Sequence, residues 1–149
     1  MEGKDDIFCE EIEVGEERPR TVMSGLRKYF TEDQLLHRKV VVITNLKPRR
    51  VGSFVSEGMV ICAVNGDRSV VEFVEPPKGA LVGEVIQFEG LPAVVPDEEV
   101  NPNRKTSPWG KCAESLRVTE EGVAAFQNNA FMTSAGKCTV KSLKDAQLC

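Results

Sequence analysis

The 149-residue sequence predicts a mainly β fold, a small barrel or sandwich followed by a small α/β subdomain. Two observations support this class. Short β-branched segments separated by Gly, Pro and Asn turns recur through the first two thirds, at roughly the 8–12-residue spacing of small barrels and sandwiches. Beyond Leu91 the prolines cluster and the pattern becomes partly helical.

The first part of the chain is predicted to be a series of short strands. Residues 7–14 and 20–24 are β-branched segments, and a glycine ends each of them. Pro48 ends a third strand, because proline cannot donate a hydrogen bond to a ladder. This third strand is expected over residues 39–46, and further strands are expected over residues 58–64, 70–74 and 84–88.

One short helix interrupts these strands. It is expected over residues 31–36, because Thr31 can serve as N-cap and Gln34, three residues on, completes a capping box. Among small barrels, a set of short strands with a single helix favours an OB-like barrel.

The last third is predicted to form an appended α/β subdomain. Ser107, followed by a proline, is typical of a helix start, so a helix is expected over residues 109–116. A second short helix is expected over residues 120–126. We therefore predict a barrel domain over residues 1–90 and a C-terminal extension over residues 91–149.

Charge is distributed in blocks along the chain. The formal net charge is −4, which by itself argues against nucleic acid. Residues 18–50, however, hold nine Lys or Arg against two acids, a net +7, between residues 1–17 and residues 51–100 at −7 each. Residues 101–149 carry +3. A block of one sign can carry a local field that the total conceals.

The cysteine and histidine inventory predicts no catalysis, no metal site and no cofactor. The five cysteines are widely spaced without a C-x-x-C pair, and His37 is the only histidine, whereas zinc sites show close ligand pairs. No Walker loop or G-x-S-x-G motif accompanies His37. We interpret the cysteines as free thiols in a reducing cytoplasm, with Cys9 and Cys62 buried inside strands. No apolar run approaches the roughly 20 residues of a membrane span.

The basic block has two interpretations. Lys47, Arg49 and Arg50 follow a predicted strand, so they are expected in a loop that projects from the barrel rim. Guanidinium groups can fork onto phosphates, and OB barrels bind oligonucleotides across a sheet face and its flanking loops. Alternatively, the block is a solvated surface that pairs with the acidic blocks.

Three ordered motifs resemble a known family. Residues 20–26 (RTVMSGL), 45–48 (NLKP) and 56–59 (SEGM) are similar to the signature of the tRNA-binding domain of endothelial-monocyte-activating polypeptide II. Similar domains are appended to methionyl- and tyrosyl-tRNA synthetases. In the second half, residues 98–105 resemble the linker that leads into the C-terminal extension of that polypeptide. Residues 130–133 and 141–144 resemble the extension of metazoan tyrosyl-tRNA synthetase.

The resemblance implies an OB barrel that binds tRNA by its structure and assists an aminoacyl-tRNA synthetase or multisynthetase complex. It implies an extension that packs on the barrel as a pseudo-dimer interface, hence a monomer. A protein-interaction or cytokine-like role is the alternative that the family also offers. For Met59 a core position is as good an interpretation as contact with RNA. The RNA-binding residues expected are Arg27, Lys28, Asn45, Lys47, Arg49, Arg50, Ser56, Met59, Arg104 and Lys105.

One departure concerns the N-terminus. Residues 3–8 align with the end of the loop after the family's first strand, so that strand is missing from this sequence. Either the sequence is truncated or the barrel is open, and an open edge favours a dimer or strand exchange.

Overall fold

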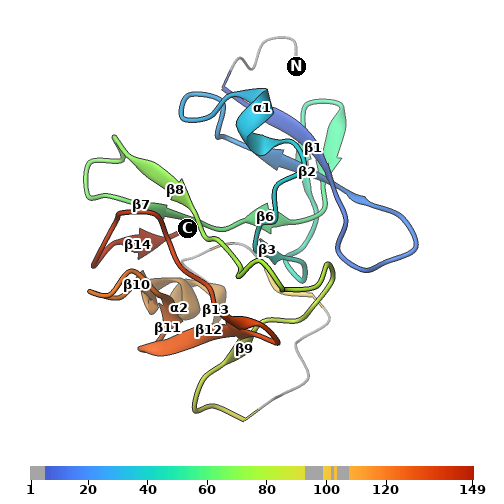
Figure 1. Ribbon diagram of the computed structural model, residues 1–149. Coiled ribbons are helices and arrows are strands. Elements are labelled where there is room, and N and C mark those ends of the chain that lie inside the picture. Colours follow the sequence, from blue (N-terminus) through green and yellow to red (C-terminus); the bar gives the residue numbers. More distant parts are fainter. Residues whose placement is uncertain (1–5, 93–98, 102, 104–107) are drawn as a thin grey trace.

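The computed structural model describes residues 6–92, 99–101, 103 and 108–149, and it is mainly β (Figure 1). Its helices are α1 (Glu32–Leu35) and α2 (Pro108–Glu114). Its strands are β1 (Phe8–Ile12), β2 (Arg20–Ser24), β3 (Val42–Ile43), β4 (Arg49–Val51), β5 (Phe54–Ser56), β6 (Met59–Val60), β7 (Cys62–Val64), β8 (Val71–Phe73), β9 (Gln87–Phe88), β10 (Leu116–Val118), β11 (Ala124–Phe126), β12 (Asn129–Thr133), β13 (Gly136–Lys137) and β14 (Gln147–Leu148). No helix among the described residues is long and apolar enough to cross a lipid bilayer.

The first two strands, which the sequence predicts, pair with each other as a β-ribbon. β1 and β2 pair antiparallel from Phe8 opposite Ser24 to Ile12 opposite Arg20. Alternate residues of β1 face the protein, and Phe8 and Ile12 pack against a core cluster that contains Val22. This alternation fixes the register, because a slip by one residue would expose the apolar side chains.

The capping box at the start of α1 is partly confirmed. The Gln34 side chain accepts a hydrogen bond from the Thr31 backbone N–H at 2.8 Å, and Glu32 and Asp33 occupy the first turn. The helix is short, and none of its residues is buried.

The largest sheet joins the two parts of the chain. Its order is β13-β12-β11-β10-β14-β7-β8, and β9 adds to β12. The last strand, β14, pairs antiparallel with β7, so that Leu148 lies opposite Ala63. The main core follows the same pattern, since Ile61 and Val74 pack in one cluster with Val118 and Leu148. The predicted extension is therefore continuous in sheet and core with the first part of the chain.

The expected barrel is not closed. The strands described fall into four sheets, the large sheet and the pairs β1-β2, β3-β6 and β4-β5. β1 has β2 on one side, and its other edge has no partner among the described residues. A barrel requires every edge to be paired, so this arrangement is an open one.

Three sequence predictions need correction. Residues 120–126 do not form a helix: Gly122 adopts φ +81, and the following β11 pairs with β10 and β12. The strand expected over residues 39–46 pairs as a ladder only at β3, because its neighbour β6 is equally short. Cys9 is exposed, since it lies on the outer face of β1, whereas Cys62 is buried as predicted.

Candidate nucleic-acid interface

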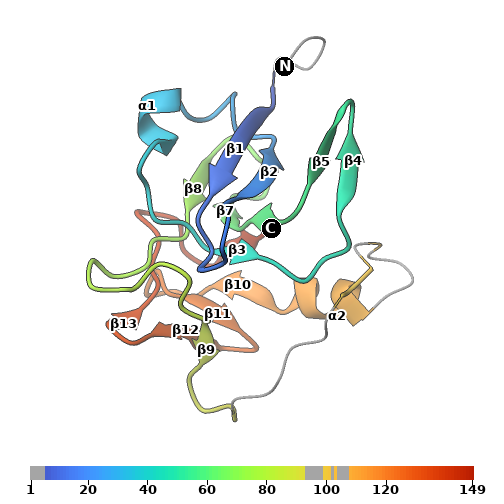
Figure 2. The same cartoon turned by 90° about the vertical axis from the view of Figure 1, so that its right-hand side faces the viewer.

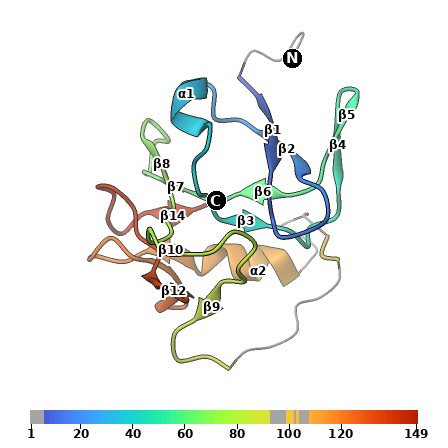
Figure 3. The same ribbon diagram turned by 45° about the vertical axis from the view of Figure 1, so that its right-hand side comes forward.

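A two-stranded hairpin, β4–β5, projects from the body of the molecule (Figures 2 and 3). Arg49 lies opposite Ser56, Arg50 opposite Val55, and Val51 opposite Phe54. A two-residue turn joins the strands, and its first residue, Gly52, adopts φ +63, as the first central residue of a primed hairpin turn must. Arg49 and Arg50 were predicted to lie in a loop, and they lie in a strand instead.

The hairpin and its approach carry three exposed cations. Lys47, Arg49 and Arg50 are exposed, and within the described part of the chain their side chains have no acidic or hydrogen-bonding partner. Each therefore keeps its full charge toward solvent. Such groups are available to an anion at little desolvation cost.

The two faces of the hairpin differ. Side chains alternate along a strand, so Arg49, Phe54 and Ser56 share one face, and Arg50 shares the other with Val55. Phe54 and Val55 at the tip are each 41 % exposed. Sequence reasoning missed these two residues, although Gly-Ser between β-formers is a hairpin signal that could have located them.

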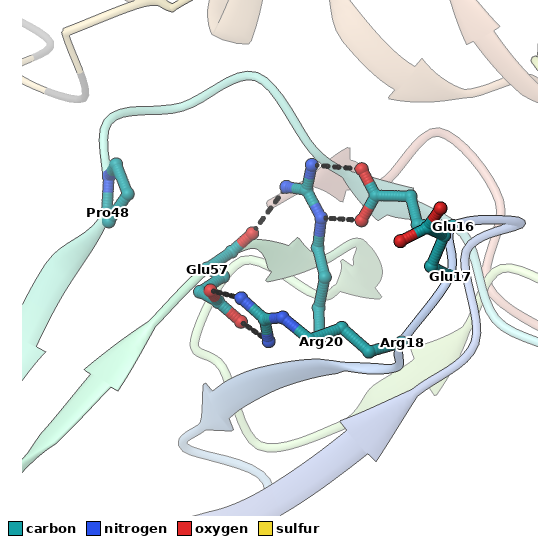
Figure 4. Close-up of a pocket in the computed structure, with 6 residues that line it drawn as sticks. All are labelled: Glu16, Glu17, Arg18, Arg20, Pro48 and Glu57. Atoms are coloured by element: carbon teal, nitrogen blue, oxygen red, sulfur yellow. Dashed lines mark hydrogen bonds and ion pairs between the residues drawn. The ribbon is translucent and has the colours of Figure 1, made fainter.

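Arg20 fixes the base of this hairpin (Figure 4). Its Nη1 donates to the carbonyl oxygen of Thr44 at 2.6 Å and to that of Glu57 at 2.8 Å, and these residues precede and follow the hairpin. Its Nε and Nη2 donate to the Glu16 carboxylate at 2.6 and 2.8 Å, and this holds the pKa of Glu16 below its ordinary value. One guanidinium thus joins both ends of the hairpin segment to the β1–β2 loop.

Glu57 ties the exit of the hairpin to β2. Its carboxylate pairs with Arg18 at 2.9 Å and accepts the backbone N–H of Thr21 at 3.1 Å, and these bonds lower the pKa of Glu57. Its own backbone N–H donates to the Thr21 carbonyl at 2.8 Å. A shallow depression of about 440 Å³ lies over this cluster, lined by Glu16, Glu17, Arg18, Arg20, Pro48 and Glu57.

Ser56 and Met59 lie behind the hairpin. Ser56 is 8 % exposed, and its hydroxyl accepts the Met23 backbone N–H at 2.9 Å and donates to the Gly58 carbonyl at 3.2 Å. In this position the hydroxyl supports the strand. Met59 is half-buried in β6 and packs against the main core cluster, which fits the core interpretation.

A second segment lies beside the approach to the hairpin. Val100 donates to the Asn45 carbonyl at 2.6 Å and accepts from the Lys47 backbone N–H at 2.8 Å, so that Leu46 and Val100 form a parallel bridge. This pairing brings the chain just before the predicted Arg104 and Lys105 next to the exposed cations. Arg104 and Lys105 themselves lie outside the described residues.

Arg27 and Lys28 stand apart from the hairpin, in the loop after β2. Both are exposed, and Lys28 pairs with Asp6 at 3.1 Å. The structure therefore groups Lys47, Arg49 and Arg50 with the backbone of Asn45, and it places Arg27 and Lys28 at another edge.

Two further sequence predictions concern His37 and metal binding. His37 lies exposed after α1, where its backbone adopts φ +59. A cluster of three potential metal ligands does not occur among the described residues.

The chain is similar to known proteins. Residues 1–85 match the family described as "Putative tRNA binding domain". The chain is 42 % identical over 144 residues to a probable methionine–tRNA ligase of Oryza sativa subsp. japonica, covering 97 % of this chain and 18 % of that protein. It is 39 % identical over 145 residues to the cytoplasmic tyrosine–tRNA ligase of Danio rerio, covering 97 % and 27 %. The chain thus spans about a quarter or less of these relatives.

A solved structure is similar throughout. The crystal structure of the C-terminal domain of Plasmodium vivax p43 matches with a TM-score of 0.92 at 31 % identity, covering 100 % of this chain and 88 % of that one.

Proposed function

The chain belongs to the tRNA-binding domain family, and from this premise we propose that it is a non-catalytic module that binds tRNA. The observation that supports the proposal most directly is the exposed cation group of Lys47, Arg49 and Arg50 on a projecting hairpin. Their side chains are free to meet phosphates, whereas other arginines of the same basic block are occupied by acids. We expect recognition by shape and charge, because phosphate contacts carry no base sequence.

We further propose that the module assists an aminoacyl-tRNA synthetase in the cytoplasm, as a monomer. The relatives named above are tRNA ligases, and this chain corresponds to a part of each. An added site for tRNA would raise the local tRNA concentration at a synthetase without new catalytic chemistry.

For the architecture we infer an open OB-like barrel over residues 1–90, on which residues 91–149 pack as an extension in the manner of a pseudo-dimer interface. The pairing of β14 with β7 and the shared core support this packing.

The experiment that tests tRNA binding is a salt titration of affinity. Each phosphate neutralised gives a slope of about 0.7–0.9 in log Kd against log salt. Replacing Lys47, Arg49 and Arg50 together by Ala should lower the slope by about 2 and weaken binding strongly at low salt. A matched control replaces the exposed Lys78, Lys141 and Lys144, which removes the same charge elsewhere. Equal loss in both variants, or no salt dependence in the wild type, would contradict the proposal.

A further inference from the structure

Phe54 occupies an unusual place for a phenylalanine. It is 41 % exposed at the tip of the β4–β5 hairpin, and the remaining phenylalanines, all of them described, are buried or half-buried. Neither core cluster includes it. The ring therefore lies partly in water on a projecting hairpin that also carries Arg49 and Arg50, where an external partner can reach it.

We propose that Phe54 stacks on an unpaired RNA base while the cations of the hairpin hold the neighbouring phosphates. This inference rests on the proposed tRNA binding and specifies the RNA element that the hairpin meets. Aromatic rings stack on any base, because every base presents a π face. The ligand is therefore a single-stranded loop or bulge next to a helix, with a base free to leave its stack.

The surroundings of the ring favour RNA over an apolar protein surface. Arg49 lies on the same face of the hairpin as Phe54, and Arg50 lies on the opposite face beside Val55. Neither guanidinium has an intramolecular partner among the described residues. An apolar partner that covers the Phe54 face would have to desolvate the Arg49 guanidinium without compensation, whereas a nucleic-acid strand supplies phosphates beside an exposed base.

The support beneath the hairpin keeps this ring in place. Ser56, two residues after Phe54 on the same face, is buried and hydrogen-bonded to Met23, and Arg20 joins the entry and exit of the hairpin. A tip that is already ordered loses little conformational entropy on binding. Stacking can then add to affinity instead of offsetting the cost of ordering.

The test compares two RNA probes across a set of tip variants. The probes are a tRNA transcript and a blunt RNA duplex with the same number of phosphates, and the whole chain is used. Phe54→Ala should weaken tRNA binding about tenfold and leave duplex binding unchanged, because a continuous duplex offers no free base. The salt slope should stay as in the wild type, since no charge is lost.

Two further variants separate stacking from other effects. Phe54→Leu keeps an apolar side chain and should bind tRNA as weakly as Phe54→Ala, whereas Phe54→Trp should bind at least as tightly as wild type. In a Trp109→Phe background, the fluorescence of the Trp at position 54 should be quenched by tRNA and unaffected by the duplex. Val55→Ala is the control on the other face of the hairpin and should change tRNA affinity by at most about twofold.

Several outcomes would overturn the inference. The first is an unchanged tRNA affinity in Phe54→Ala, and the second is wild-type affinity in Phe54→Leu. The third is a loss of duplex affinity in Phe54→Ala that equals its loss of tRNA affinity. The fourth is a Phe54→Ala protein that binds tRNA normally but no longer captures synthetases from an RNase-treated lysate. If wild-type binding shows no salt dependence, the proposed function fails as well, so the two failures are distinguishable. Urea unfolding of each variant shows whether the fold is retained.

Discussion

Two groups of arginines in one basic block have opposite uses. Arg18 and Arg20 are bound by Glu57 and Glu16, and Arg20 also holds two backbone carbonyls. Arg49 and Arg50, on the hairpin that Arg20 supports, have no intramolecular partner among the described residues. Arginines thus stabilise the base of the hairpin in one place and present positive charge to solvent in the other. The net charge of the block therefore overstates the positive charge that is available to a ligand.

Three further cations of the block are also bound by oxygen atoms or an aromatic ring. Lys28 pairs with Asp6, Arg38 pairs with Glu75 and lies over the Phe73 ring, and the Lys39 ammonium donates to the carbonyls of Lys78 and Ala80. Arg27, in the loop after β2, is the exception: it is exposed, and its side chain has no partner among the described residues.

Replacing Arg20 should give the largest effect. Arg20→Met leaves the Thr44 and Glu57 carbonyls and the Glu16 carboxylate without their donor, so we expect a loss of about 2 kcal/mol in unfolding free energy. The tRNA affinity should fall roughly tenfold or more, because the hairpin base is no longer held. Urea unfolding and tRNA titration measure the two effects. Arg18→Met, which removes a more exposed pair, should change both much less, and equal effects of the two variants would contradict the division drawn here.

Replacing the hairpin arginines singly should affect binding alone. Arg49→Ala and Arg50→Ala should each lower the salt slope by about 0.7–0.9 and weaken binding a few-fold, with unfolding free energy unchanged. The reason is that neither side chain has a folded-state partner to lose. Arg18→Ala serves as the control and should leave the slope as it is. A destabilised Arg50→Ala protein would show that the hairpin cations are structural.

The smallest expected effect concerns an acidic residue, Glu10, and the pH dependence of folding stability. Glu16 and Glu57 have arginine partners, whereas Glu10 is partly buried on β1 and has only the Ser24 hydroxyl at 2.8 Å. Burial raises the pKa of Glu10 to about 6 from an ordinary 4.5, although the Ser24 hydrogen bond lowers it. Ionisation therefore costs the folded state more than the unfolded state, and stability should fall as pH rises from about 4.5 to about 6.

Glu10→Gln should remove this dependence. At pH 7 we expect the variant to be more stable by on the order of 1 kcal/mol, less than the full pKa shift implies because the side chain keeps some solvent contact. Urea unfolding at pH 4 and pH 7 measures the effect. Parallel pH profiles for wild type and variant would rule out Glu10 as the titrating group.

Local signals in the sequence predicted much of the fold. β1, β2, α1 and α2 were all predicted from glycine stops, a capping box and a Ser-Pro start. The hairpin was missed because Pro48 and consecutive arginines read as a loop, while the Gly52 turn that pairs β4 with β5 is brief. A helix is predicted over residues 120–126, but Gly122 interrupts it and the following residues pair with β10 and β12. Which cations of the block are free depends on contacts between distant residues such as Arg18 and Glu57, which no local pattern contains.

The pairing of β14 with β7 has a consequence for how this chain acquires its structure. Two residues far apart in the sequence, Cys62 and Cys149, exchange both backbone hydrogen bonds, at 2.8 and 2.9 Å. Contact order is therefore high, and the large sheet can be completed only after residue 149 has left the ribosome. Until then β7 keeps one edge unpaired, so we expect slow folding and a nascent intermediate that associates readily with other extended strands.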